Sequence, residues 1–239
     1  MTKKSSWMLA GALLAAAGAA NAGEFSSTIT ATSDYDFRGV SQSAKDPALQ
    51  LSLDYGLDNG LYVGAWASNV DFGGDEDFEL DLYLGWAFEN DNGTSWDFSY
   101  TRYLYPGDKA DADYDEFAVK FGYGGVGLEV WYAPDYGNTG LETWYYAANY
   151  DVELAEGWTL NLHAGYNTGQ YFKQGWGTGP GVKDGSYLDY SLGVTRTWGN
   201  FDISLRYLGV DVPTIYREPG DVLNSENPAL LSVSTTLPW

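Results

Sequence analysis

Hydrophobic and polar residues alternate with a period of two along most of this chain. The clearest example is residues 78–88, FELDLYLGWAF, where Phe, Leu and Trp occupy one parity and mostly polar or small residues the other. Such alternation places the two sets on opposite faces of a β-strand. After the first 22 residues, no stretch of the chain has convincing helical periodicity. The pattern predicts an all-β protein. Twelve strands are expected, near residues 25–38, 47–57, 61–71, 77–89, 94–105, 114–123, 126–135, 141–155, 158–168, 186–198, 201–211 and 229–239.

Short and long connections alternate between these expected strands. Tight turns rich in Gly, Asn and Asp, which tolerate positive φ, follow the even-numbered strands. They lie at residues 58–60, 90–93, 124–125, 156–157 and 199–200. Longer connections follow the odd-numbered strands, at residues 39–46, 72–76, 106–113, 134–140, 169–185 and 212–228. Short periplasmic turns, longer extracellular loops and an even strand count are typical of outer-membrane barrels. We therefore expect a transmembrane antiparallel up-and-down β-barrel of about 12 strands.

The N-terminus has the features of a secretory signal peptide. Two lysines precede an apolar run, and Ala20-Asn21-Ala22 fits a signal-peptidase site. The apolar run is shorter than the roughly 20 residues that a helix needs to cross a bilayer. We expect cleavage after Ala22, which leaves one outer-membrane barrel domain over residues 23–239 and places the protein in the cell outer membrane.

A soluble barrel buries its apolar face inside, whereas a membrane barrel turns that face outward. Expected strand lengths are mostly close to the 9–11 residues of a tilted transmembrane strand, and Trp and Tyr lie near strand ends as in interfacial girdles. The chain finishes LLSVSTTLPW, an alternating strand that ends on an aromatic residue, Trp239. Such an end resembles the signal that the outer-membrane assembly machinery reads. The expected partners are outer-membrane lipid and this machinery.

Composition excludes several classes of protein. The chain has 33 acidic and 12 basic residues, a formal net charge of −21, which argues against nucleic acid or an anionic membrane surface as a partner. It has no cysteine, which excludes disulfides and thiolate chemistry. No cofactor is expected.

If the apolar parity faces lipid, the polar parity lines the lumen. This parity is mainly acidic, and an acidic wall favours cations over anions; alternatively, its charges form a solvated or ion-paired plug. Arg102 and Arg196 fall on the lipid parity near strand ends, where a long side chain can reach the interface. The candidate pore-lining residues are Asp34, Asp36, Arg38, Glu79, Asp81, Glu116, Lys120, Glu129, Asp189, Asp202 and Arg206.

Searches for catalytic and metal-binding motifs find little. The single histidine, His163, is expected to line the lumen rather than to act in catalysis, and no G-x-S-x-G motif is present. No enzyme is therefore expected. The acidic stretches 71–77 and 111–116 could bind divalent cations through carboxylates, but neither has EF-hand spacing, so solvated acidic loops are the favoured interpretation. The Gly-rich stretch 169–185 has no phosphate-loop pattern and predicts a flexible loop.

Residues 33–42, SDYDFRGVSQ, followed by PALQ at 47–50, carry a family resemblance. They resemble the opening of the TorF family, exported proteobacterial proteins grouped with porins. The resemblance implies an outer-membrane channel-like protein and supplies no site residue. In the expected first strand, Tyr35 and Phe37 face lipid. Arg38 then faces the lumen beside Asp34 and Asp36, either as an ion-paired cluster at the pore mouth or as a selectivity element.

Three functions remain open on the sequence. The main hypothesis is a porin-like channel for passive diffusion of ions or small polar solutes, with cationic solutes favoured. The second is a plugged barrel that acts as a structural, adhesive or ligand-binding surface protein, with its function in the loops 169–185 and 212–228. A soluble periplasmic β-protein is the third.

Overall fold

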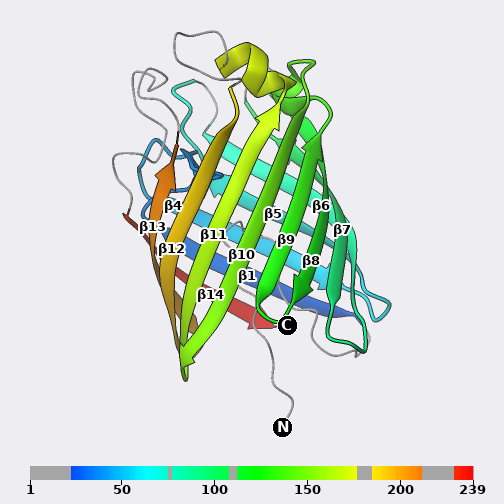
Figure 1. The fold of residues 1–239 in the computed structure, drawn as a ribbon, viewed down its shortest axis with the longest axis vertical. Coiled ribbons are helices and arrows are strands. Elements are labelled where there is room, and N and C mark those ends of the chain that lie inside the picture. The colour runs from blue at the N-terminus through cyan, green and yellow to red at the C-terminus, as the bar shows by residue number, and fades with distance from the viewer. Residues whose placement is uncertain (1–22, 75–76, 108–111, 177–184, 212–228, 239) are drawn as a thin grey trace.

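Twelve strands form one closed antiparallel barrel in the computed structural model, which describes residues 23–74, 77–107, 112–176, 185–211 and 229–238 (Figure 1). Each barrel strand pairs with its neighbour in the chain, and β1 closes the barrel by pairing with β14. The strands are β1 Glu24–Thr32, β4 Ala48–Gly56, β5 Leu61–Asn69, β6 Phe78–Glu89, β7 Ser95–Leu104, β8 Tyr114–Tyr123, β9 Val126–Ala133, β10 Thr143–Ala155, β11 Trp158–Gly169, β12 Tyr187–Trp198, β13 Phe201–Val210 and β14 Ala229–Pro238.

The predicted all-β barrel is confirmed, and eleven of the twelve predicted strands match observed strands to within two residues at each end. The first strand is the exception. It was expected over residues 25–38, but β1 ends at Thr32. The next residues leave the barrel wall, and their path defines the candidate site described below.

The apolar face of the barrel points outward. On β6, Leu82 and Leu84 are 46% and 52% exposed, whereas Glu79 and Asp81 on the opposite face are 1% and 3% exposed. Large apolar and aromatic side chains stay exposed on every barrel strand from β4 to β14. A water-soluble barrel would expose its polar face instead, so the exterior has the character of a lipid-facing surface.

The two ends of the barrel differ, as the alternating connections predicted. We call the end with the tight turns the turn end and the other the loop end. Glycines with positive φ, including Gly60 and Gly93, occupy the tight turns, a conformation that other residues adopt at a cost. Among the described residues, no helix is long and apolar enough to cross a membrane.

Some predictions concern segments outside the described residues. These are the signal peptide at residues 1–22, the connection at 212–228 and the terminal aromatic residue Trp239. The Gly-rich stretch is described only in part. There the chain forms a short π-helix, η2 (Phe172–Trp176), next to the end of β11.

Candidate functional site in the barrel lumen

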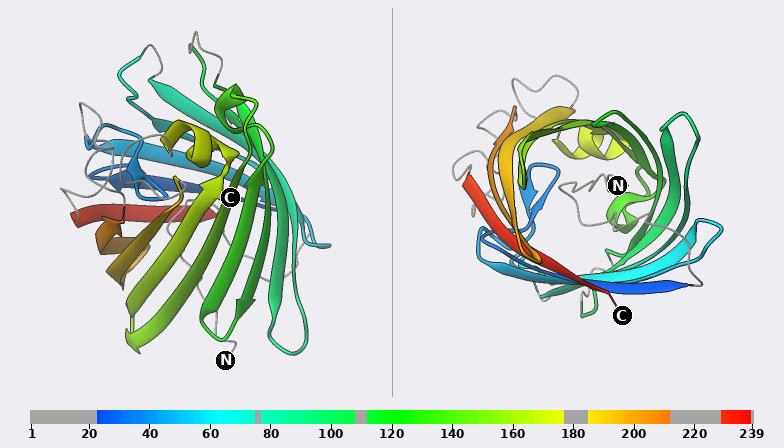
Figure 2. Two further views of the ribbon diagram at one scale, coloured as in Figure 1. Left: turned by 45° about the horizontal axis from the view of Figure 1, so that its top comes forward. Right: turned by 90° about the horizontal axis from the view of Figure 1, so that it is seen from below.

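Residues 33–47 fold into the barrel as a small hairpin, which we call the inward hairpin (Figure 2, right). Its strands are β2 (Asp36–Phe37) and β3 (Val40–Ser41), which pair with each other and not with the barrel. Arg38 and Gly39 form the two-residue tip, with φ of 53° and 82°. Two successive positive φ angles are the signature of a type I′ turn, which suits the twist of a short hairpin.

The expectation that Tyr35 and Phe37 face lipid was wrong. Tyr35 is 8% exposed, and its ring packs edge-on against inward-facing Trp66 at 5.2 Å. Phe37 packs against the ring of Tyr103 at 6.2 Å. The physical reason is packing: both rings are held by inward-facing aromatic residues of β5 and β7, which they could not contact from the lipid side of the wall.

Asp34 fixes the base of the inward hairpin. Its carboxylate accepts hydrogen bonds from the hydroxyls of Ser41 at 2.5 Å and Ser43 at 3.0 Å. The hydroxyl of Thr32 donates to the backbone carbonyl of Asp34 at 2.7 Å. Because Asp34 is buried, the two serine hydroxyls supply the polar partners that its carboxylate needs. Asp34 therefore has a structural role in this conformation.

Arg38 pairs with Glu116 on β8, across the lumen from the first strand. Its Nη1 and Nη2 donate to the two carboxylate oxygens at 2.8 and 2.9 Å, a bidentate salt bridge with side chains only 10% and 1% exposed. Tyr103 also donates its hydroxyl to Glu116, at 3.0 Å. Burial disfavours the charged guanidinium, but the charge and hydrogen bonds of Glu116 outweigh it and raise the pKa of Arg38 well above its ordinary value.

The expected pairing of Arg38 with Asp34 and Asp36 is therefore corrected. Asp34 bonds serine hydroxyls, and Glu116 holds the salt bridge. Asp36, half-buried on β2, lies within electrostatic reach of Arg206 on β13. The tip conformation explains the difference, because left-handed backbone at Arg38 turns its side chain away from the parity of an extended strand.

Aromatic rings of the far wall surround the hairpin tip. The Arg38 guanidinium lies 4.3 Å from the ring centroid of Tyr145 on β10 and 5.3 Å from that of Trp131 on β9. The hydroxyl of Tyr187 on β12 donates to the backbone carbonyl of Arg38 at 3.1 Å. Stacking on aromatic faces stabilises a buried guanidinium.

Gly39 brings the tip against the wall formed by β12 and β13. A Cβ at Gly39 would lie 2.3 Å from Cγ1 of Val210 on β13 and 2.9 Å from Cβ of Asp189 on β12. A side chain there would collide with the wall. The hairpin tip thus meets β12 and β13 on one side and Glu116 of β8 on another, so it projects into the lumen.

Further aromatic side chains pack at the loop end. The rings of Tyr103 and Tyr114 stack at 4.4 Å, and Tyr114 meets Tyr136 at 4.7 Å. Tyr136 belongs to the short helix η1 (Tyr136–Asn138). Phe172 of η2 continues this packing onto Tyr187 at 5.4 Å. These rings narrow the loop end around the hairpin.

Three inward tyrosines cross a glycine on the neighbouring strand and donate to an aspartate one strand further on. The tyrosine rings lie where a glycine side chain would be, so each needs the missing Cβ. The phenol hydroxyl gives each inward carboxylate a neutral hydrogen-bond donor. The three sets are Tyr62–Gly85–Asp97, Tyr83–Gly64–Asp54 and Tyr145–Gly165–Asp189.

Replacing Gly165 with alanine tests these crossings. The new Cβ would lie 2.2 Å from the Tyr145 hydroxyl oxygen and 2.5 Å from Oδ2 of Asp189, so the ring must move. We expect a loss of about 1–3 kcal/mol in the free energy of unfolding, typical of overpacking. Urea unfolding in lipid vesicles measures it. The matched control is Gly127→Ala, where the nearest atom, Cβ of Asn149, lies at an ordinary 3.6 Å. Equal losses would contradict this explanation.

His163 belongs to a polar network on the inner wall. Its Nε2 lies 2.8 Å from Oδ1 of Asp189 and 2.9 Å from the Tyr145 hydroxyl, and its Nδ1 lies 2.7 Å from Oδ1 of Asn149. Asn149 in turn donates to Glu129 at 2.9 Å. Both ring nitrogens are thus engaged in a wall network, in keeping with the lining or structural role expected for His163.

The remaining candidate residues also lie on the inward face of the barrel strands. Lys120 is buried between its register partners Asp97 and Glu129, with Nζ 4.7 Å from the Trp131 ring centroid. Near the turn end, Asp202 accepts from the hydroxyl of Thr197 at 2.5 Å. Arg206 donates to Ser191 at 2.9 Å.

The sequence reasoning missed most of the inward aromatic residues. Tyr62, Trp66, Tyr103 and Tyr114 stand on the polar parity of their strands, which was the available signal. Aromatic residues in barrels were read as interfacial girdles, and that interpretation concealed the inner set. The charged inner wall therefore carries many more phenol and indole groups than expected.

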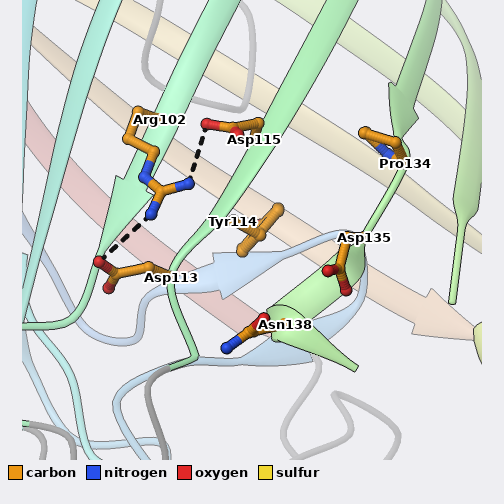
Figure 3. A pocket seen from close by; sticks show the side chains of 7 residues that line it. All are labelled: Arg102, Asp113, Tyr114, Asp115, Pro134, Asp135 and Asn138. Carbon is orange, nitrogen blue, oxygen red and sulfur yellow. Dashed lines mark ion pairs between the residues drawn. The ribbon is translucent and has the colours of Figure 1, made fainter. Parts of the chain in front are cut away.

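A cleft of about 170 Å³ lies at the loop end, outside the hairpin (Figure 3). Arg102 stands between Asp113 and Asp115, with nitrogen–oxygen distances of 3.6 and 3.1 Å. These two acids of the stretch 111–116 thus share one arginine, whose single charge offsets one of theirs. Within the described part of the chain, no group of three or more His, Cys, Asp or Glu is placed to hold a metal ion.

Comparison with known proteins assigns the fold to the class of porin barrels. A KdgM porin matches with a TM-score of 0.54 and 8% identity, over 90% of this chain and 99% of that chain. A structure of KdgM porin in complex with disordered oligogalacturonate matches with a TM-score of 0.50 and 7% identity, over the same shares. At these identities, the likeness concerns the fold alone.

The chain belongs to the family described as "Bacterial protein of unknown function (Gcw_chp)", whose model matches residues 16–236. This match does not confirm the TorF name, although the porin-type fold agrees with what that resemblance implied. No curated protein sequence matches the chain significantly.

Proposed function

We propose that this protein is an outer-membrane channel for the passive diffusion of ions or small polar solutes. The observation that carries the proposal is the closed barrel with an apolar exterior and a charged, hydrogen-bonded interior. A barrel of this kind satisfies its backbone in lipid and presents polar groups to water inside. Its fold is also that of the KdgM porin. No enzymatic activity is proposed.

The inward hairpin acts as the constriction of this channel. It is held by a buried salt bridge to β8 and by contacts of its tip with β12 and β13, and it projects into the lumen near the loop end. Towards the turn end, inward residues such as Asp151, Asn161 and Asp202 are only half-buried. A wider vestibule therefore opens at the turn end and narrows at the hairpin.

The solutes we propose are cations or neutral polar molecules. Inward acids outnumber the inward bases Arg38, Lys120 and Arg206, so the wall repels anions. The similar KdgM porin is described in complex with oligogalacturonate, which is anionic. We propose a different preference for this chain, because its own wall is mainly acidic.

Current through planar lipid bilayers tests the proposal. In a salt gradient, the zero-current potential should have the sign of cation preference. Asp151→Asn with Asp202→Asn should move it towards zero, because both carboxylates face the vestibule; each accepts a hydrogen bond that an amide oxygen also accepts. The control is Asp91→Asn at the tip of an exposed turn, which should leave it unchanged. Absence of current from correctly folded protein at every voltage would exclude a channel.

A plugged barrel is the second candidate function, and the hairpin is the observation that favours it. If the hairpin never leaves the lumen, the barrel presents its loops and passes nothing. The two candidates differ in one measurement, because removal of the hairpin converts a plugged barrel into a conducting one but only widens a channel that already conducts.

A further inference from the structure

Glu79 and Asp81 form a buried carboxyl pair on the inward face of β6, beneath the inward hairpin. They are two residues apart on one strand, so their side chains share a face and are neighbours on it. Neighbouring carboxyl groups of this kind can hydrogen-bond to each other. A hydrogen bond between two carboxyl groups requires one proton. The pair is 1% and 3% exposed, which excludes water from it.

The surroundings do not neutralise two negative charges. Oε2 of Glu79 and Oδ1 of Asp81 are buried and accept no hydrogen bond. Across the described ranges, neither carboxylate takes part in a salt bridge, and Arg38 is engaged by Glu116. Two adjacent carboxylates in a water-excluded site cannot both ionise without a compensating cation.

The ionisable groups that face the pair come from several elements. Most are phenols, which are neutral at ordinary pH, and the one further carboxylate, Glu116, adds negative charge. From β5, the register partners are the non-ionisable Trp66 and Ser68. The facing groups are Tyr35 of the hairpin, Tyr83 on β6, Tyr103 and Tyr105 at the end of β7, Glu116 on β8 and Tyr136 of η1.

The inward hairpin covers the pair directly. Tyr35 donates its hydroxyl to Oε1 of Glu79 at 3.2 Å. Its ring packs in a buried cluster with Ala48, Trp66 and Tyr83. Water can therefore reach the carboxyl groups from this side only if the hairpin moves.

We propose that Glu79 and Asp81 share one proton and form a pH-sensitive latch that keeps the inward hairpin seated. When the proton leaves, two like charges remain in a buried site, and Tyr35 can donate to only one oxygen. Water then enters, which displaces the hairpin. The seated state binds one proton more than the displaced state, so seating is favoured at low pH and is lost as pH rises.

Cysteine labelling tests the latch itself and does not depend on the proposed channel function. Only the effect of the latch on ion flow rests on that function. The chain has no cysteine, and Ala48→Cys places a small thiol in the buried cluster under Tyr35. The labelling rate of the full-length folded protein by a maleimide is measured across the pH range, with Asp81 intact and with Asp81→Asn. The ratio of the two rates cancels the titration of the thiol itself.

We expect this ratio to rise with pH, by up to about tenfold per pH unit, the limit for release of one proton. An amide at position 81 can donate to Glu79 at every pH, so the D81N hairpin should stay seated. Glu89→Gln removes a charge from the exposed end of the same strand and should behave as wild type. If D81N does not fold, Glu79→Gln replaces it, again with a flat profile expected.

A ratio that stays constant with pH would overturn the latch, as would a D81N profile that follows wild type. Bilayer current measured on the same proteins separates the two proposals. A pH-dependent labelling ratio without current at any pH supports the latch and contradicts the channel. Current that persists while labelling ignores pH supports the channel and contradicts the latch.

Discussion

Replacing Glu116 with alanine is expected to lower the free energy of unfolding by about 3–5 kcal/mol, because it leaves the buried guanidinium of Arg38 without its partner. The two side chains are 10% and 1% exposed, so water does not replace the lost carboxylate while the hairpin stays seated. Urea unfolding in lipid vesicles, followed by tryptophan fluorescence, measures the loss.

Two controls isolate the buried charge. The double change Arg38→Met with Glu116→Leu removes both charges together and should cost clearly less than Glu116→Ala alone. Asp115→Ala breaks the exposed ion pair with Arg102, whose side chains are 36% and 38% exposed, and should cost about 0–1 kcal/mol. If Glu116→Ala costs no more than Asp115→Ala, the salt bridge does not hold the hairpin.

Excision of the inward hairpin is expected to raise the bilayer conductance several-fold, since it removes the segment that occupies the lumen. Thr32 and Ala48 are register partners in the β1–β4 ladder, so Asn-Gly in place of residues 33–47 can close them with a two-residue turn. The barrel wall keeps its strands, and heat-modifiable migration on gels checks that it has folded.

The matched control excises another long connection. Ala133 and Thr143 are also register partners, so Asn-Gly can replace residues 134–142 in the same way. That connection carries η1 at the loop end and lacks the hairpin tip that meets β8, β12 and β13, so its loss should change conductance less. Equal effects of the two excisions would show that the hairpin is no specific barrier.

Most of the barrel was predictable because period-two alternation and turn composition act locally. β8 was expected at residues 114–123 and is found there, bounded by residues that favour turns. The inward parity of Glu79 and Asp81 followed from the same rule, since each neighbour on the strand faces the other way.

The hairpin was not predictable from that rule, since its causes are long-range. Tyr35 and Phe37 continue the alternation of β1. Their partners Trp66 and Tyr103 lie on β5 and β7, and the sequence near residues 35–37 does not predict these contacts. The missed signal was the Arg38-Gly39 pair, which suits a turn with positive φ.

The contacts of the hairpin tip also set an order of assembly. Arg38 precedes its partners Glu116 and Tyr187 by 78 and 149 residues in the chain. The tip can therefore dock only after β8 to β13 have formed the wall it touches, although its own residues follow the first strand. Long-range contacts of this kind form late in folding. Docking of the hairpin is thus a late step in the maturation of the barrel, and the wall that receives it is built without its support.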